Sequence, residues 1–102
     1  MGKHVEYHPK AKTEIQESLN WYEGKVIGLG LEFLLEVKSA ESQVVQNPKL
    51  YPIYEGETRR YLLKRFPYAL VYLESADKIT IVAVAHCMRK PGYWKNRLSK
   101  AA

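Results

Sequence analysis

The run of residues 79–85, ITIVAVA, constrains the fold more than any other stretch of the chain. It is apolar at nearly every position and rich in β-branched residues, which predicts a central strand covered on both faces. The surrounding region, residues 59–97, holds two further runs rich in aromatic and β-branched residues, with arginines and lysines before, between and after them. A sheet with cations along its ends holds charge in fixed positions, so this region favours an anionic ligand.

The first half of the chain has the pattern of one strand and two helices. Residues 3–7 alternate enough to predict a short strand, and Pro9 suits the first turn of a helix. A first helix is predicted from Ala11, Ile15, Leu19 and Tyr22, and a second over residues 29–46 from Gly30, Phe33, Leu34, Val37, Ala40 and Val44. Asn47-Pro48 ends the second helix, because the residue before proline disfavours the helical region. The glycines between the helices predict an antiparallel helical hairpin.

The second half of the chain predicts a sheet. Residues 48–58 form a loop in which Tyr51 and Tyr54 anchor on the core, and strands follow at 59–66, 68–74 and 78–86. The three-residue link at 75–77 makes the last two strands antiparallel. A short helical element closes the chain over residues 91–99. The order β-α-α-β-β-β predicts an α+β fold, with an antiparallel sheet packed against the helical hairpin.

Composition limits the classes of protein to which the chain can belong. With 102 residues and 46% hydrophobic residues, it predicts one domain with a real core. Its one cysteine, Cys87, excludes an internal disulfide and fits the reducing cytosol. No run approaches the about 20 apolar residues of a membrane span, and the sequence MGKHVEYHPK lacks the features of a signal peptide. We therefore expect a cytoplasmic protein that does not bind a membrane.

Charge is divided unevenly along the chain. Residues 1–57 carry six Lys and nine Glu, a net charge of −3, whereas residues 58–102 carry ten Lys and Arg against one Glu and one Asp, a net charge of +8. This division predicts that the basic half faces a polyanion or an acidic protein, and the alternative is a merely soluble basic surface.

The most buried strand ends in residues that suit chemistry or binding. His86 titrates near neutrality and is a candidate general acid or base, with Arg89 and Tyr93 close behind it in the sequence. Arg89 and Arg97 are candidate anion contacts, while Tyr93 and Trp94 have rings on which bases could stack. The alternative is structural. His86 then bonds to a backbone carbonyl, and the two aromatic residues fix the tail on the sheet.

A second basic group surrounds the first strand of the sheet. Arg60 and Lys64 share one face of an extended strand, whereas Arg59 and Arg65 share the other. Lys64 and Arg65, beside the Phe66-Pro67 turn, are the better candidates for binding an anion. The alternative is that these charges protect an edge strand from pairing with other molecules.

The sequence predicts no metal site and no cofactor. His4, His8, His86 and Cys87 do not fall at metal-ligand spacing, because His4 and His8 flank a strand rather than lie four apart on a helix. The GLG segment at residues 28–30 lacks the longer glycine pattern and the preceding strand of a phosphate-binding loop.

Several phrases of the sequence, taken in order, resemble one family. They are NWYEGKVIGLGLEFLLEV, NPKLYP, RRYLLKRFPYALVY and IVAVAHCMRKPGYWKNR. Together they resemble the RelE/ParE family of bacterial toxins from type II toxin–antitoxin modules, over nearly the whole of residues 1–102. The resemblance implies a cytosolic toxin domain that a cognate antitoxin holds inactive in a hetero-oligomer. The antitoxin of such a module wraps the toxin with a helical or disordered segment, and the charge division suits an acidic partner.

The resemblance implies one of two activities. RelE-like members cleave messenger RNA on the ribosome without a metal, using Lys, Arg and a C-terminal Tyr, whereas ParE-like members bind DNA gyrase and stall it. Lys64 and Arg65 fall near the family's basic position, and Arg89 and Tyr93 match the C-terminal Arg and Tyr of the ribonucleases. The family's next strand has a GYRLVY-like pattern, which reads PYALVY here, so Ala69 stands where that pattern has an arginine. This departure, the HCMRKPGYW ending and the long helical hairpin favour the ParE-like and plasmid-stabilisation branch, with a ribonuclease as the alternative.

Overall fold

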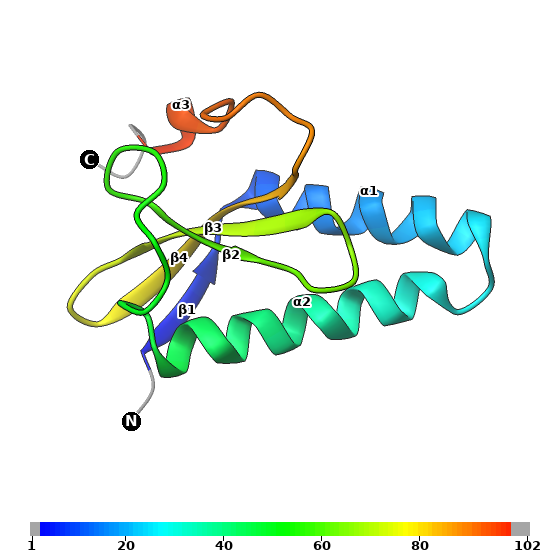
Figure 1. The fold of residues 1–102 in the computed structure, drawn as a ribbon, viewed down its shortest axis with the longest axis horizontal. Coiled ribbons are helices and arrows are strands. Elements are labelled where there is room, and N and C mark those ends of the chain that lie inside the picture. The colour runs from blue at the N-terminus through cyan, green and yellow to red at the C-terminus, as the bar shows by residue number, and fades with distance from the viewer. Residues whose placement is uncertain (1–2, 99–102) are drawn as a thin grey trace.

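The computed structural model describes residues 3–98 and has the predicted order of elements (Figure 1). The elements are β1 (His4–Tyr7), α1 (Pro9–Lys25), α2 (Leu29–Gln46), β2 (Arg59–Leu62), β3 (Tyr68–Glu74), β4 (Lys78–His86) and α3 (Lys95–Leu98). The bounds of α2, β3 and β4 are those that the sequence predicts. The α+β fold class is confirmed.

The sheet has the strand order β1-β4-β3-β2. Strands β2, β3 and β4 are antiparallel neighbours, as predicted. The difference from the prediction is the pairing of β1, which is parallel to β4. The sheet is therefore mixed rather than purely antiparallel. Because α1 and α2 carry the chain away from β1 before the other strands form, β1 can enter the sheet on the far side of β4 without a hairpin.

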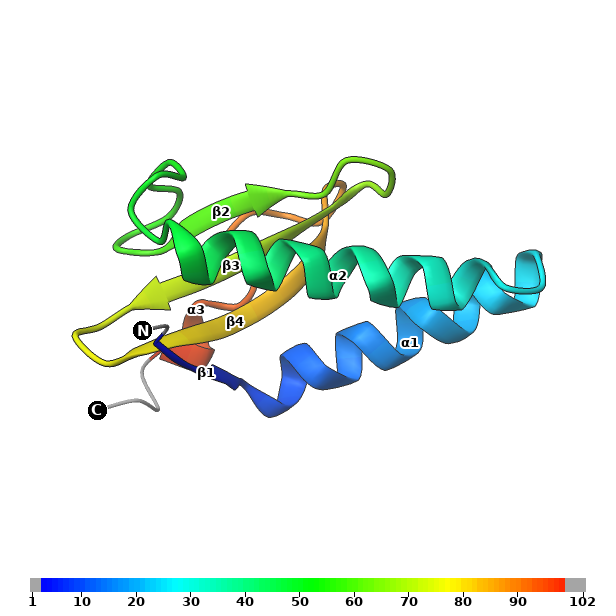
Figure 2. The ribbon, with the colours of Figure 1, turned by 90° about the horizontal axis from the view of Figure 1, so that it is seen from below.

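The helical hairpin covers one face of the sheet (Figure 2). Phe33 and Val37 of α2 are fully buried against Leu70, Tyr72 and Ile81 in one core cluster. Tyr22, Phe33, Phe66 and Tyr68 form a group of aromatic rings 4.9–6.2 Å apart under the end of this layer. The predicted apolar face of α2 is therefore the face that packs on the sheet.

The second face of the sheet is covered by the C-terminal segment and by the loop over residues 48–58. Trp94 is 1% exposed and packs against Val71, Val82 and Ala83, with Tyr54 at the margin of the cluster. The β3–β4 register shifts at Val82, because Val71 is opposite Ala83 while Tyr72 is opposite Ile81. This bulge turns both Val82 and Ala83 towards the second face. Strand β4 is thus covered on both faces, as its sequence predicts.

Two glycines set the geometry of the helical hairpin. Gly28 has φ of 90°, a left-handed conformation that favours glycine. A Cβ on Gly30 would lie 2.6 Å from the carbonyl oxygen of Leu19, so glycine lets α2 approach α1 closely. The Glu23 carboxylate accepts the N–H groups of Gly28 and Gly30 and thereby caps the start of α2. The hairpin projects beyond the end of the sheet (Figures 1 and 2).

Candidate functional site

The end of β1 leaves part of β4 without a neighbouring strand. Tyr7 pairs with Ile81, and the next residue, His8, donates its N–H to the Ile81 oxygen at 2.9 Å before α1 begins. Beyond this point β4 is an edge. The Glu14 carboxylate of α1 takes the place of a strand there and accepts the Val84 N–H at 2.9 Å. A side chain from the helical layer therefore satisfies the open edge of β4.

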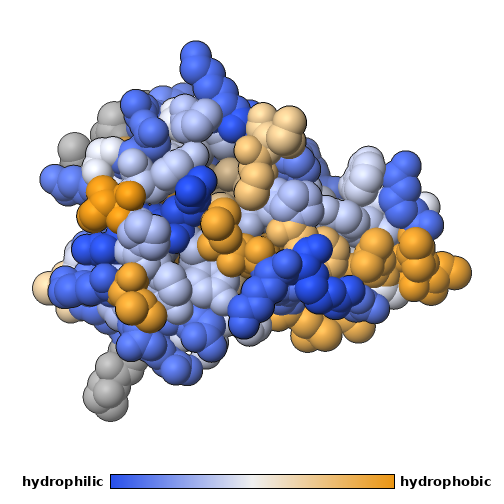
Figure 3. Space-filling model, viewed as in Figure 1, coloured by the Kyte–Doolittle hydropathy of each residue, from blue (hydrophilic) through white to orange (hydrophobic). Residues whose placement is uncertain are grey.

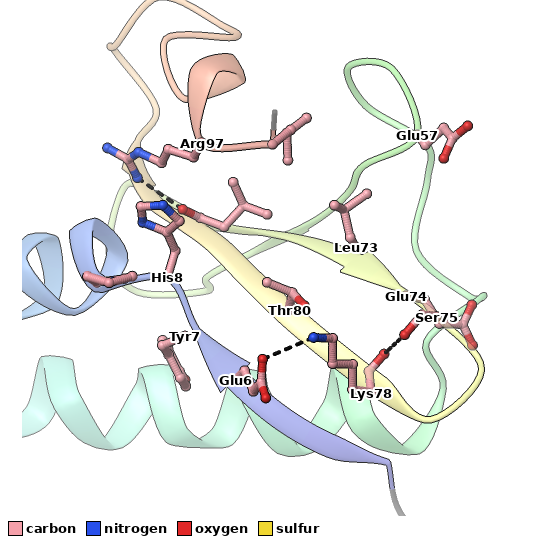
Figure 4. Close-up of a pocket in the computed structure, with 13 residues that line it drawn as sticks. Glu6, Tyr7, His8, Glu57, Leu73, Glu74, Ser75, Lys78, Thr80 and Arg97 are labelled. Atoms are coloured by element: carbon pink, nitrogen blue, oxygen red, sulfur yellow. Dashed lines mark hydrogen bonds and ion pairs between the residues drawn. The ribbon is translucent and has the colours of Figure 1, made fainter. Parts of the chain in front are cut away.

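Arg97 and Tyr93 complete this arrangement from the opposite face of the sheet. The Arg97 guanidinium donates to both carboxylate oxygens of Glu14, at 2.8 and 3.1 Å, and to the Val82 oxygen at 3.0 Å. Figure 4 shows Arg97 directed at this carbonyl, close to His8. The Tyr93 hydroxyl donates to Glu14 at 2.6 Å. We call Glu14, Tyr93 and Arg97 the Glu14 cluster, and it joins the two layers around the edge of β4.

The electrostatics of the Glu14 cluster keep Tyr93 protonated. Burial raises the pKa of the Tyr93 phenol, and its hydrogen bond to the Glu14 carboxylate raises that pKa further. The Arg97 side chain is only 9% exposed, and its guanidinium forms an ion pair with Glu14 inside the protein. Both residues were predicted as functional from their sequence positions, and both serve here to hold the C-terminal segment on the sheet.

Trp94, which the sequence predicts as a contact residue, lies inside the protein. It is 1% exposed and fills the second core cluster, so its ring has no free face on the surface for a base or a partner. The structural alternative, in which aromatic residues fix the tail on the sheet, describes Trp94 as the structure places it.

His86 lines the same small hollow as the other two predicted catalytic residues. Its ring lies 5.0 Å from that of Tyr68, which packs on the helical side of the sheet. Its Nδ1 accepts the Met88 N–H at 3.0 Å. Tyr93 belongs to the cluster on the opposite face, with the Arg89 guanidinium 3.6 Å from its ring centroid. All three residues therefore line one small hollow, in which the His86 ring lies against Tyr68 and the Tyr93 ring lies under Arg89.

Lys64 and Arg65 lie in the turn after β2, which ends at Leu62 rather than at the predicted residue 66. The Glu36 carboxylate of α2 accepts both of their backbone N–H groups. The Arg65 side chain forms an ion pair with Glu32, at 2.7 Å. These contacts hold the turn against α2, on the helical side, whereas Arg89 stacks on the opposite face. The two basic groups do not form one site.

Arg60 is a candidate that the sequence reasoning did not select. It is opposite Val71 in the β2–β3 register, and Val71 faces the second core cluster. The Arg60 guanidinium lies 4.1 Å from the Tyr54 ring centroid. A shallow hollow on this face is lined by both Arg60 and Arg89. Alternation along β2 places Arg60 on the same side of the sheet as the loop over residues 48–58. This could be deduced only once the strand register was known.

A larger hollow, of about 490 Å³, lies over β1 and β4 and is drawn in Figure 4. Most of its charged side chains are in ion pairs: Lys78 contacts Glu6 at 3.1 Å, and Glu74 is contacted at 2.8 Å by Lys49, which lies outside the lining. Lys49 lowers the pKa of the Glu74 carboxyl through a hydrogen bond, against the opposing effect of burial. This hollow therefore presents balanced charge rather than a basic surface.

Two further features of residues 3–98 concern metal ions and membranes. They contain no group of three or more His, Cys, Asp or Glu side chains placed to hold a metal ion. Among the helices of the same residues, none is both long enough and apolar enough to cross a bilayer.

Comparison with known proteins agrees with this architecture. No family model and no curated protein matches the sequence. A solved structure described as the chromosomal ParDE TA system from P. aeruginosa is similar, with a TM-score of 0.71. The alignment covers 82% of this chain and 95% of that chain, at 17% sequence identity. This chain has a ParE-like fold. The ParE-like fold confirms the architecture that the resemblance implied.

Proposed function

We propose that the protein is the toxin of a type II toxin–antitoxin module and that it acts as a ParE-like inhibitor of DNA gyrase. In this proposal it inhibits by binding, in the cytoplasm, and a cognate antitoxin neutralises it in a hetero-oligomer. The ParE-like fold supports the toxin assignment. The observation that carries the choice of mechanism is the Glu14 cluster, because it occupies the Tyr93 hydroxyl and the Arg97 guanidinium.

The chemistry of RNA cleavage explains why this observation matters. Cleavage requires a base for the 2′-hydroxyl, cations for the phosphorane and an acid for the leaving 5′-oxygen. The Tyr93 hydroxyl donates a hydrogen bond to Glu14, and the His86 ring lies 5.0 Å from the Tyr68 ring. The two candidate acid–base groups that line the hollow with Arg89 are therefore already engaged within the protein, Tyr93 with Glu14 and His86 with the Met88 N–H. A protein that binds its target does not need an acid–base pair.

The surface of the helical hairpin supports a protein partner. Large apolar side chains are exposed at its projecting end and along α2, and orange atoms gather there in Figure 3. They are Trp21, Val26, Ile27, Leu31 and Leu35, each 57–94% exposed. Exposed apolar patches of this kind mark interaction sites. We expect this end of the hairpin to be covered when the antitoxin is bound.

The alternative function is a RelE-like, ribosome-dependent mRNA endoribonuclease. The observation that favours it is Arg89, which lies exposed beside Tyr93 with its guanidinium free of any carboxylate in the described chain. In that mechanism Lys64, Arg65, His86, Arg89 and Tyr93 serve the site, and removing an acid or base lowers cleavage about 10²–10⁴-fold. The ribosome would have to rearrange Tyr93 away from Glu14.

Induction from a tightly repressed promoter, without an antitoxin, tests the proposal. Growth arrest with a DNA-damage response supports a gyrase toxin, and the His86→Ala and Tyr93→Phe variants should arrest growth like the wild type. Growth arrest without a DNA-damage response or gyrase inhibition would contradict the proposal. A chain that does not arrest growth would be a degenerate member that only binds its partner.

A further inference from the structure

The arginines of the chain differ in whether they have an acceptor. Arg59 donates to two backbone carbonyl oxygens, Arg65 pairs with a carboxylate of α2, and Arg97 pairs with a carboxylate of α1. The guanidinium groups of Arg60 and Arg89 have no hydrogen bond or ion pair within residues 3–98; each instead lies over a tyrosine ring. Both line the same shallow hollow. The unmatched arginines are therefore in one place.

The tyrosine rings hold these two guanidinium groups in position. Arg60 lies 4.1 Å from the Tyr54 centroid and Arg89 lies 3.6 Å from the Tyr93 centroid. Such cation–π contacts orient a guanidinium while leaving its N–H groups free to donate. Tyr93 is itself fixed through its hydroxyl to Glu14. The hollow thus carries two positioned donor groups of like charge, with Lys90 also in its lining.

Nearby acidic side chains do not neutralise the hollow. Glu55, next to Tyr54 in the chain, pairs with Lys95 at 3.4 Å. Two planar guanidinium groups without acceptors suit an oxyanion, and a carboxylate matches their fork geometry with two parallel hydrogen bonds. The missing acceptor must come from another molecule.

The occupied ring faces distinguish between two kinds of anionic partner. Arg89 and Arg97 lie 3.6 and 5.2 Å from the Tyr93 ring centroid. Arg60 lies 4.1 Å from the Tyr54 centroid, and the Trp94 ring lies 6.2 Å from it. Single-stranded nucleic acids bind by stacking bases on open aromatic faces. Each of these rings already has a guanidinium over it, and the hollow is small. The site fits a carboxylate better than a nucleotide.

We propose that Arg60 and Arg89 form a receptor for an Asp or Glu side chain of the antitoxin segment. This inference rests on the proposed function and names the chemistry of its partner. The acidic side chain bridges β2 and the loop after β4, and it replaces the water that solvates the two guanidinium groups. The partner segment therefore crosses the face of the sheet opposite the helices, as well as covering the hairpin.

Side-chain NMR of the five arginine Nε–Hε groups tests this site with defined probes. The probes are an N-acetylated, C-amidated hexaglutamate peptide and hexauridylate, each titrated into the full chain at the same ionic strength. With the peptide we expect the Arg60 and Arg89 resonances to shift together, while those of Arg65 stay in place. Binding should weaken at least tenfold in Arg60→Gln and in Arg89→Gln. The matched control Arg65→Gln, an exposed arginine on the helical side, should bind within twofold of the wild type.

Two results would overturn the inference. Equal weakening in Arg65→Gln would show diffuse attraction to a basic surface, and tighter binding of hexauridylate at Arg60 and Arg89 would show a nucleic-acid site. Arg89→Lys keeps the positive charge but loses the planar guanidinium fork, so it should also weaken peptide binding. This variant replaces Arg89→Gln in the test if the Gln variant does not fold. A wild-type protein that arrests growth but does not bind the peptide would contradict this inference alone. Absent growth arrest in the wild type would contradict the proposed function alone.

Discussion

Glu14 of α1 and Arg97 of α3 are joined by two hydrogen bonds, at 2.8 and 3.1 Å, around the edge of β4 that β1 leaves open. The two residues come from opposite layers of the fold, and their side chains are 13% and 9% exposed. Glu14 also accepts the Val84 N–H, and Arg97 also donates to the Val82 oxygen. The pair therefore completes the backbone hydrogen bonding of the central strand as well as joining the layers.

Replacing Glu14 with alanine should strongly destabilise the protein. The substitution leaves Arg97 without its carboxylate and Val84 with an unsatisfied N–H, and breaking a buried pair in this way costs about 3–5 kcal/mol. Urea unfolding followed by circular dichroism measures the change in the free energy of unfolding. The exposed pair of Glu32 and Arg65 provides the control, since Glu32→Ala should cost less than about 1 kcal/mol. Equal effects of the two substitutions would contradict the structural role of the Glu14 cluster.

Tyr93→Phe separates the structural role of this residue from a catalytic one. The variant loses the hydroxyl hydrogen bond to Glu14 but keeps the ring under Arg89. We expect the free energy of unfolding to fall by about 1–2 kcal/mol, because a hydrogen bond to a charged acceptor is lost. Growth arrest on induction should persist at matched protein levels. A variant that is stable but no longer arrests growth would indicate that the hydroxyl has a functional role.

Gly30→Ala should destabilise the helical hairpin. The new Cβ would lie 2.6 Å from the Leu19 oxygen, which belongs to the backbone and cannot turn aside. Overpacking of this kind costs about 1–3 kcal/mol, measured by thermal or urea unfolding. Gly24→Ala is the matched control, because a Cβ at Gly24 meets nothing within 4 Å and alanine favours the helix. A Gly30→Ala variant as stable as Gly24→Ala would contradict the close approach of α1 and α2.

Stability should fall in mildly acidic solution through His8. Its Nδ1 accepts the Lys10 N–H at the start of α1, which requires a neutral ring. Burial lowers the pKa of His8, and the nearby charges of Arg97 and Lys10 lower it further, while Glu14 opposes them. The unfolded chain, in which the histidine pKa is about 6.5, binds this proton more readily. His8 therefore stabilises the fold above the unfolded pKa, and that stability is lost as the pH falls through the lower folded pKa.

The melting temperature between pH 7.5 and 5.5 measures this effect. His8→Asn keeps a capping acceptor without a titrating ring, so its melting temperature should fall less than that of the wild type. His4→Gln, at a largely exposed histidine, should follow the wild type. The same pH dependence in His8→Asn and the wild type would show that other groups cause the loss.

The sequence predicts most of the fold because its signals are local. Helix α2 follows from apolar spacing and from Asn47-Pro48, and β4 follows from the apolar run at residues 79–85. The parallel pairing of β1 does not follow, since no local signal in residues 4–7 selects a partner more than 70 residues away. The early end of β2 depends on Glu36, which binds the turn from another element.

The candidate site was less predictable because it depends on register and on distant partners. Arg97 looks like a free cation until Glu14, 83 residues earlier, is placed beside it. The bulge at Val82 places both Val82 and Ala83 in the second core cluster, which strict alternation along β4 does not predict. Arg60 and Arg89 are 29 positions apart in sequence, and only the folded sheet shows that they line one hollow.

The most direct measurement of the central claim pairs two assays after induction without an antitoxin. One maps new 5′ ends of cellular mRNA, and the other follows supercoiling of relaxed plasmid by gyrase with the purified protein. We predict that supercoiling is lost while the mRNA stays intact, and that Tyr93→Phe behaves in the same way. New mRNA ends with normal supercoiling would instead show an endoribonuclease and contradict the binding mechanism.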